Sequence, residues 1–329
     1  SPSPRPLTFN QFICCRVMAL KRPSLRERRS VSLGLICAKE DIESQVVRYA
    51  SWSGDDFAAE NEEGQVLNAP DRLHIQELLG QGSAGSVYRA RSPEGQEVAV
   101  KVTRCLDSEM LEARYKEFQI LKELDHPNVI KVLSFYVSGA QAMLVMELQL
   151  HGSLQRAIRE RKHLSEMASQ PLFRMLLRAI DYLHQHGVVH RDVKPSNILV
   201  SADLSSLWLA DFGSAHSVLQ GEALSLTATF DFAAPEILCG DSPSQKGDIW
   251  SAGVTLHSML KGQLPKRFCS YASFGAYATA VASKPVQCEG SEWKDLSADC
   301  RATLQACMTI DMASRPEAAE LLKQSWLME

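Results

Sequence analysis

The most regular pattern of hydrophobic positions in the chain lies between Glu97 and Val102, where valine recurs at every second residue. In an extended strand, alternate side chains point to opposite faces. The three valines therefore share one face, and Ala99 and Lys101 share the other. Shorter runs of similar character predict further strands over residues 73–79, 86–91 and 143–146.

Helical spacing of hydrophobic residues first appears over residues 109–124 and then dominates the rest of the chain. In the first helix the spaced residues are Met110, Phe118, Leu121 and Leu124. Further helices are predicted over residues 172–184, 247–260 and 316–327. The order of elements predicts an α+β fold in which a small strand-rich lobe with one main helix precedes a larger, mainly helical lobe. A ligand is expected in the crevice between the lobes.

The first 70 residues differ from the rest of the chain and show no sustained periodicity. Seven basic residues and a single acid, Glu27, fall within the first thirty positions, whereas the stretch 55–63 is acidic. This composition predicts a flexible, largely disordered extension. The arginine-rich, acid-poor start is also similar to a transit peptide, which is the alternative interpretation.

Charge and cysteine content narrow the possible partners. The 329 residues carry a formal net charge of −4, so the composition does not suggest nucleic acid or a membrane surface as a partner. No hydrophobic run approaches the roughly 18 residues of a transmembrane helix. The nine cysteines are scattered, with no CxxC pair. This spacing argues against a zinc site or a disulfide framework and favours a reducing, cytoplasmic setting.

A glycine-rich loop joins the first two predicted strands. It consists of Gly80, Gln81, Gly82, Ser83, Ala84, Gly85, Ser86 and Val87. Glycines in such a loop let backbone N–H groups approach phosphate oxygens closely. The loop lacks the Lys-Ser/Thr of a Walker motif and opens a hairpin rather than a helix, which argues against a P-loop and a dinucleotide-binding fold.

Lys101 lies on the face of its strand that is expected to point toward a ligand. A lysine on the inner face of a hydrophobic strand is costly unless an acid pairs with it. Glu117, on the helix that follows, is the expected partner, and Glu112 is the competing choice. Such a pair would direct the ammonium group at the α and β phosphates of a nucleotide.

Two short motifs carry the candidate chemistry. Residues 190–197 read HRDVKPSN, and Asp211 opens a DFG sequence fourteen residues after Asn197. Asp192 can accept the proton of an incoming hydroxyl, and Lys194 can neutralise charge on the transferred phosphoryl group. Asn197 and Asp211 can hold a divalent metal against a triphosphate. The two motifs at this spacing predict metal-assisted phosphoryl transfer.

Motif by motif and in order, residues 73–326 resemble the eukaryotic protein kinase family. The sequences Ala234-Pro235-Glu236 and Asp248-Ile249-Trp250 and the later Arg315 complete the match. The resemblance implies a bilobal kinase fold, with ATP and Mg²⁺ as cofactors. Its divisions are an N-lobe over about 73–146, a hinge over about 147–150 and a C-lobe over about 151–326.

The resemblance also implies roles for residues that periodicity alone does not single out. The side chains that would enclose adenine are Leu79, Val87, Ala99 and Leu199. Met146 would lie at the back of the pocket, and Glu147 and Leu148 would offer backbone hydrogen bonds. Glu236 and Arg315 would form a buried ion pair, while His190 and Phe212 would pack rather than react.

Lys194 within DVKPSN resembles the serine/threonine type, and HGSL at 151–154 is similar to kinases of the upper tiers of mitogen-activated cascades. The implied partner is a protein with a serine or threonine acceptor. Thr229 would contact the catalytic Asp and Lys. Arg191 would bind a phosphate in the activation segment, added by an upstream kinase at Ser225 or Thr227.

Two alternatives remain open at the level of the sequence. A pseudokinase or scaffold would bind nucleotide without transferring phosphate, but such proteins commonly lack one of Lys101, Asp192 or Asp211, and all three are present here. A small-molecule phosphotransferase would share the lobes. The segment that ends at Glu236 argues against it, because in kinases that segment docks polypeptide.

Overall fold

The computed structural model describes residues 73–82, 85–92, 94–217, 230–265, 274–283, 286 and 288–328. All of them belong to one unit of the chain, Ala59–Glu329. The predicted extension over residues 1–70 lies outside the described residues. So do Ser83 and Ala84 of the glycine loop and the candidate regulatory residues Ser225, Thr227 and Thr229.

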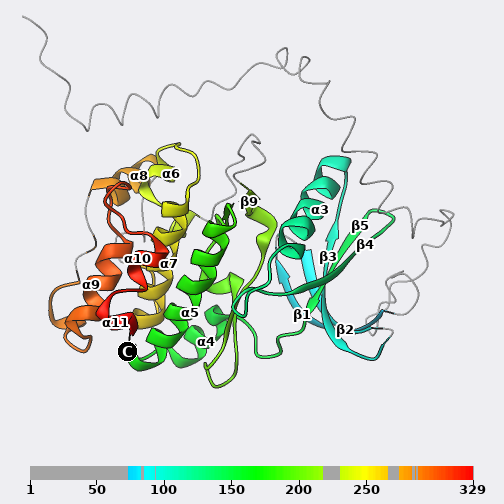
Figure 1. Ribbon diagram of the computed structural model, residues 1–329, viewed down its shortest axis with the longest axis horizontal. Helices are drawn as coiled ribbons and strands as arrows, with labels where there is room; N and C mark the ends of the chain where they lie inside the picture. The colour runs from blue at the N-terminus through cyan, green and yellow to red at the C-terminus, as the bar shows by residue number, and fades with distance from the viewer. Residues whose placement is uncertain are drawn as a thin grey trace, which may run out of the picture. The chain divides into compact units, whose positions relative to one another are not determined.

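The N-terminal lobe contains, among the described residues, a five-stranded antiparallel sheet covered by one helix (Figure 1). The strands lie side by side in the order β1-β2-β3-β5-β4. Their bounds are β1 (His74–Gly82), β2 (Gly85–Arg91), β3 (Glu97–Arg104), β4 (Val132–Ser138) and β5 (Gln141–Glu147). The predicted strands are confirmed, and β4 is an element that the sequence pattern did not indicate.

The two faces of β3 pack into two different hydrophobic clusters, as the alternation predicts. Val98, Val100 and Val102 pack with Met143 of β5 on one face. Ala99 belongs instead to the larger cluster that extends into the helical lobe. Lys101, two residues from Ala99, shares that second face. The alternation therefore directs the lysine toward the helical lobe.

Helix α3 (Ser108–Lys122) begins where the side chain of Asp107 accepts a hydrogen bond from the backbone nitrogen of Met110. Such a cap satisfies one of the open N–H groups of the first turn. The predicted helix is confirmed, but Met110 is 38% exposed rather than part of the core. The buried side of the helix includes Glu117, a position that only a paired acid occupies at low cost.

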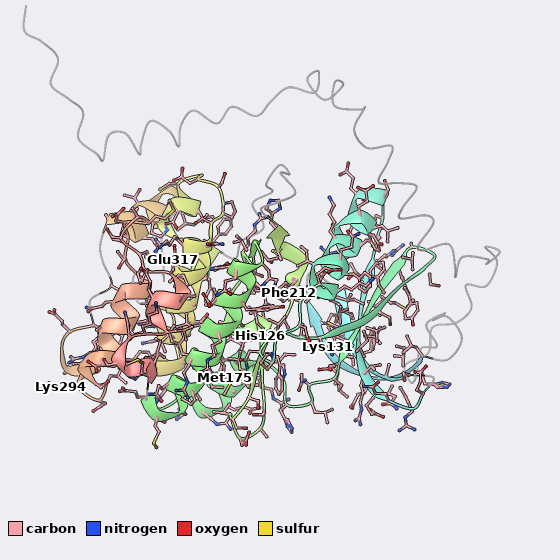
Figure 2. The ribbon with its side chains drawn as sticks, viewed as in Figure 1. His126, Lys131, Met175, Phe212, Lys294 and Glu317 are labelled. Carbon is pink, nitrogen blue, oxygen red and sulfur yellow. The ribbon has the colours of Figure 1, made fainter. Side chains whose placement is uncertain are left out.

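The C-terminal lobe is mainly helical, with α5 and α7 packed against each other at its centre. Figure 2 shows Phe212 where the two lobes meet. The helix bounds are α4 (Leu154–Arg161), α5 (Glu166–Gln185), α6 (Pro235–Leu238), α7 (Gln245–Lys261), α8 (Phe274–Ser283), α9 (Ala298–Cys307), α10 (Ala318–Leu321) and α11 (Ser325–Met328). None of the described helices has the length and hydrophobicity needed to span a bilayer.

Two helix predictions differ from the structure. Helix α5 begins at Glu166, before the predicted start at residue 172, and contains Pro171. Pro171 lies beyond the first turn, where a proline removes the N–H group that would pair with a carbonyl one turn earlier. The helix nevertheless continues through it. Ser165 caps the true start by accepting a hydrogen bond from the backbone nitrogen of Ala168.

The single helix predicted over residues 316–327 is wrong, because the segment forms two short helices, α10 and α11. Side-chain contacts with other helices stabilise the interruption between α10 and α11. The side chain of Gln324 accepts a hydrogen bond of 2.7 Å from Thr303, and the indole N–H of Trp326 donates one of 2.8 Å to Glu166. These bonds to α9 and α5 outweigh the helical periodicity of the segment.

Two small strand pairs frame the segment between α5 and α6. Strand β6 (Val188–Val189) pairs with β9 (His216–Ser217), and β7 (Ile198–Val200) pairs with β8 (Leu207–Leu209). Because β7 and β8 form a hairpin, the residues at its open end, Asn197 and Ala210, are neighbours. The hairpin thereby brings the two predicted motifs together.

Candidate active site

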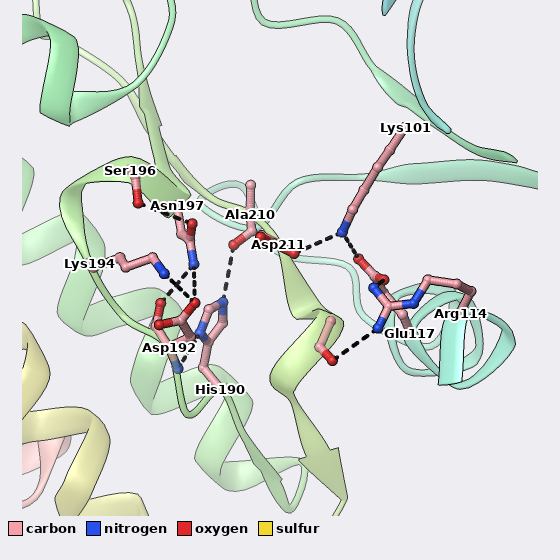
Figure 3. Close-up of polar contacts among 11 residues, drawn as sticks. Lys101, Arg114, Glu117, His190, Asp192, Lys194, Ser196, Asn197, Ala210 and Asp211 are labelled. Carbon is pink, nitrogen blue, oxygen red and sulfur yellow. Dashed lines mark hydrogen bonds and ion pairs between the residues drawn. The ribbon is translucent and has the colours of Figure 1, made fainter. Parts of the chain in front are cut away.

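The amine of Lys101 contacts two carboxylates that come from two other elements (Figure 3). Its Nζ lies 2.7 Å from Oε1 of Glu117 and 2.8 Å from Oδ1 of Asp211. The side chains of Lys101 and Glu117 are only 8% and 3% exposed. The predicted ion pair with Glu117 is therefore present, and Glu112 is not the partner that reaches the lysine.

The two ion pairs decide the protonation of the site. Burial lowers the pKa of Lys101, but the carboxylates of Glu117 and Asp211 outweigh it, so the pKa is raised above its usual value. Burial likewise raises the pKa of Asp211, and the charge of Lys101 outweighs that effect, so the pKa is lowered. Both groups are charged near neutral pH.

The segment 190–197 brings three of the predicted residues into contact. Oδ2 of Asp192 lies 2.7 Å from the amine of Lys194. The side-chain amide of Asn197 donates hydrogen bonds of 2.9 Å to the backbone carbonyl and to Oδ2 of Asp192. The carboxylate that is expected to accept a proton is therefore held from two directions.

Asp211 is joined to the segment 190–197 through the backbone. The N–H of Ala210 donates a hydrogen bond of 2.8 Å to the carbonyl of Asn197. Asp211 itself has a φ of 61°, a left-handed conformation that is uncommon for a residue with a side chain. In this conformation, the carboxylate of Asp211 points toward Lys101 and away from the β7–β8 hairpin.

His190 and Phe212 pack against each other, as expected. Their rings meet edge to face with centroids 4.8 Å apart, and both residues are buried. The imidazole Nε2 of His190 bonds to the carbonyl of Ala210 at 3.1 Å, and its Nδ1 accepts from the backbone nitrogen of Asp192 at 3.3 Å. His190 thus supports the backbone on both sides of the site.

The glycine loop forms the predicted hairpin between β1 and β2. Gln81 pairs with Ser86 and Gly82 pairs with Gly85. Gly85 has a φ of 125°, and a Cβ there would collide with the backbone of Val102. Only glycine fits this position without a shift of the strands.

The residues expected around adenine come from both lobes. Ala99 lies opposite Met146 in the register of β3 and β5, and both belong to the larger hydrophobic cluster. Val87, Leu148 and Leu199 are partly buried against that cluster. Leu79, by contrast, is 40% exposed, at a break in the pairing of β1 with β2.

Glu236 and Arg315 form the expected buried ion pair. The two terminal nitrogens of Arg315 lie 2.7 and 3.0 Å from the two carboxylate oxygens of Glu236. The guanidinium also donates to the carbonyls of Thr309 and Lys246, and it lies 5.1 Å above the ring of Trp250. A planar group with five donors satisfies all of these partners at once.

Two residues of the site were not identified as such from the sequence. Arg114 lies 2.9 Å from the second carboxylate oxygen of Glu117, and Asp248 binds the backbone at His190 and Arg191. Arg114 stands three positions before Glu117 on one helix face, so i,i+3 spacing could have found it. Asp248 had no local signal of this kind, because its partners are 57 and 58 residues away.

Comparisons with known proteins agree with this geometry. A family model described as "protein kinase domain" matches residues 73–327. The chain is 34% identical over 268 residues to sperm motility kinase 3A of Mus musculus, covering 79% of this chain and 51% of that protein. It is 33% identical over 264 residues to ribosomal protein S6 kinase alpha-4 of Homo sapiens, covering 76% and 34%. Serine/threonine-protein kinase PEPKR2 of Arabidopsis thaliana is 33% identical over 253 residues, covering 76% and 52%.

The chain therefore belongs to the eukaryotic serine/threonine protein kinase family, and its fold is the bilobal α+β fold of that family. It spans about half the length, or less, of the curated relatives named above.

Proposed function

We propose that this chain transfers the γ-phosphoryl group of ATP to serine or threonine hydroxyls of proteins. The observation that carries the proposal is the environment of Asp192, whose carboxylate is held by Lys194 and Asn197 at 2.7 and 2.9 Å. Its side chain is 11% exposed, so an incoming hydroxyl can reach it. A carboxylate fixed in this way suits the acceptance of a hydroxyl proton.

The residues at the site fit a nucleotide. The space that a Cβ would occupy at Gly80 and Gly82 is open, so phosphate oxygens can approach the backbone there. Lys101 supplies a charged amine, directed by Glu117. We infer that residues 80–87, with Ser83 and Ala84 included, cover the phosphates. Leu79, Val87, Ala99 and Leu199 would then enclose the base.

The donor set also fits Mg²⁺. The amide nitrogen of Asn197 makes both of its hydrogen bonds to Asp192. Its carbonyl oxygen accepts a longer bond of 3.3 Å from the hydroxyl of Ser196 and is the group that would bind a cation. The carboxylate of Asp211 would supply the second oxygen ligand. Mg²⁺ is usually held by one or two carboxylates together with substrate phosphates. When bound, it would supply charge neutralisation for the phosphates.

Each remaining side chain then has one task. Asp192 orients the acceptor hydroxyl and takes its proton, and the amine of Lys194 beside it stabilises negative charge on the transferred group. Met146 closes the base site from behind, and the backbone of Glu147 and Leu148 offers hydrogen bonds to its edge.

We further propose that phosphorylation of the activation segment by an upstream kinase controls the activity. Arg191, whose pKa is lowered by burial, is the cation expected to bind the phosphate. Ser225 and Thr227 are the proposed acceptors, and Thr229 is the proposed contact to Asp192 and Lys194.

We also propose a cytoplasmic location, which rests on the scattered cysteines.

A peptide-library phosphorylation assay with labelled ATP and Mg²⁺ tests the proposal. The wild-type chain should label peptides on serine or threonine. Asp192→Asn removes the proton acceptor but keeps the side-chain volume, so labelling should be lost while nucleotide binding persists. Nucleotide binding without labelling in either protein would instead support the pseudokinase or scaffold, and labelling of small molecules alone would support the other phosphotransferase class.

A further inference from the structure

Arg114 connects helix α3 with the turn that carries Asp211. One terminal nitrogen lies 2.9 Å from Oε2 of Glu117, and the other lies 3.5 Å from the backbone carbonyl of Gly213, which is a long contact. The side chain is 18% exposed. Figure 3 shows the guanidinium beside Glu117, on the side opposite Lys101. One cation therefore contacts both elements whose acids hold Lys101.

The absence of a side chain at Gly213 makes this approach possible. A Cβ built on Gly213 would lie 2.8 Å from a guanidinium nitrogen of Arg114, closer than real Cβ contacts allow. The guanidinium thus rests directly on the backbone of the turn. The long hydrogen bond to the carbonyl and this close packing are two separate signs of the same contact.

The charges of the site balance only when Arg114 is counted. Lys101 is shared between the carboxylates of Glu117 and Asp211, which leaves one negative charge in excess. Arg114 supplies the missing positive charge. A carboxylate that is 3% exposed needs such compensation, because burial of an unpaired charge is costly.

The same contact fixes the orientation of the Glu117 carboxylate. Its Oε1 accepts from Lys101 and its Oε2 accepts from Arg114, so neither oxygen can rotate away without losing a charged partner. Charge-assisted hydrogen bonds of this kind are stronger than neutral ones.

We propose that Arg114 is a positioning residue for phosphoryl transfer: it orients Glu117 toward Lys101 and holds the 211–213 turn against α3. The inference rests on the proposed function. Arg114 acts through Glu117 and the turn and does not touch the transferred group. Its loss should therefore weaken the use of ATP more than the binding of the peptide acceptor.

The first experiment compares Arg114→Gln, Arg114→Lys and a matched control, Arg104→Gln, in the 329-residue chain. Arg104 is an exposed arginine at the end of β3. We expect Arg114→Gln to lower kcat/KM for ATP by roughly ten- to a hundredfold, with KM for the peptide unchanged, because a buried charge loses its partner. Arg114→Lys keeps the charge and should recover part of the loss, and Arg104→Gln should behave as wild type.

A double-mutant cycle then tests whether Arg114 acts through Glu117. If it does, adding Arg114→Gln to Glu117→Gln should cost at most about a further twofold. The proposal would be overturned if the losses in kcat/KM of the two single variants multiplied in full in the double variant. It would also be overturned if Arg114→Lys recovered none of the loss, or if Arg114→Gln left kcat/KM for ATP unchanged.

These measurements distinguish a failure of the inference about Arg114 from a failure of the proposed function. If the wild-type chain transfers phosphate and Arg114→Gln does so equally well, only the inference about Arg114 fails. If the wild type labels no serine or threonine peptide, the proposed function fails. Calorimetric titration with Mg-ATP then decides the role of Arg114: weaker binding in Arg114→Gln than in Arg104→Gln supports it, and equal binding overturns it.

Discussion

The carboxylate of Asp248, in helix α7, lies 2.8 Å from the backbone nitrogen of Arg191, although the two residues are 57 positions apart in the chain. Arg191 has a φ of 69°, a conformation that costs a residue with a side chain about 1–2 kcal/mol. The other oxygen of Asp248 accepts from the backbone of His190 and from the ring of His184, each at 2.9 Å. A buried acid thus holds the bend that precedes Asp192.

Asp248→Asn should destabilise the fold strongly. The amide nitrogen of asparagine would face N–H groups whose hydrogen bonds the carboxylate now accepts. These buried N–H groups would then lack an acceptor. We expect the free energy of unfolding, measured in urea, to fall by about 3–5 kcal/mol. The exposed Asp295 provides the control, since Asp295→Asn should change little. Equal stability of the two variants would contradict the role assigned to Asp248.

The difference between wild type and Asp248→Asn should depend on pH. Burial raises the pKa of Asp248, but the hydrogen bond and charge of His184 outweigh it, so the pKa in the folded state is lowered. A lowered pKa contributes stability above the unfolded value of about 4, and the contribution is lost as the pH falls through the folded value. Urea midpoints at several pH values should converge below that point, and a constant gap would contradict this account.

Arg315→Lys should be destabilising despite the conserved charge. A lysine offers one ammonium group, which cannot reproduce both bonds to Glu236 together with those to the surrounding carbonyls. We expect a loss of about 2–4 kcal/mol in the free energy of unfolding. Arg159→Lys, at an exposed site on α4, is the matched substitution and should leave stability within experimental error.

A substitution on one face of β3 should lower stability, whereas a substitution on the other face should raise KM for ATP. Val100 is fully buried in the smaller cluster, so Val100→Ala should cost about 2 kcal/mol of stability and leave KM for ATP unchanged. Ala99→Leu adds volume on the opposite face and should raise KM for ATP about tenfold or more. Steady-state kinetics and urea unfolding measure both quantities, and a reversed pattern would show that the faces are misassigned.

Ser225 and Thr227 should together carry the phosphate switch. Alanine at both positions should lower the activity reached after incubation with an activating kinase by about tenfold or more, since Arg191 would lack its phosphate partner. Phosphate mapping by mass spectrometry identifies the modified position. Unchanged activity in the double variant, with no phosphate found at either residue of the wild type, would rule out this switch.

The sequence predicted elements whose signal is local. The alternation in β3 was sufficient because each of its faces is buried in a different cluster, so register and pattern agree. The same reasoning missed α4, an eight-residue helix in which only Leu154, Ala157 and Ile158 are buried. The same reasoning also predicted one helix where the structure has two, α10 and α11. Contacts to α9 and α5 outweigh the periodicity there.

The proximity of the site residues could be predicted for a related reason. Asp192, Asn197 and Asp211 are close in sequence, and one short hairpin brings them together. The pairing of Arg114 with Glu117 has a local signal, but its contact with Gly213 does not. The contact of Asp248 with Arg191 likewise joins elements that lie far apart along the chain.

By itself, the sequence determined the faces of β3, the hairpin form of the glycine loop and the identity of the acids and amines of the site, because these signals are local. Glu117 follows Lys101 by 16 residues, and Asp211 follows Asn197 by fourteen. Only the tertiary structure decided how the charges are shared. Lys101 serves both Glu117 and Asp211, Arg114 restores the balance, and Asp248 holds the bend before Asp192. A buried charge takes its partner from whichever element packs against it, and that packing is a property of the whole fold.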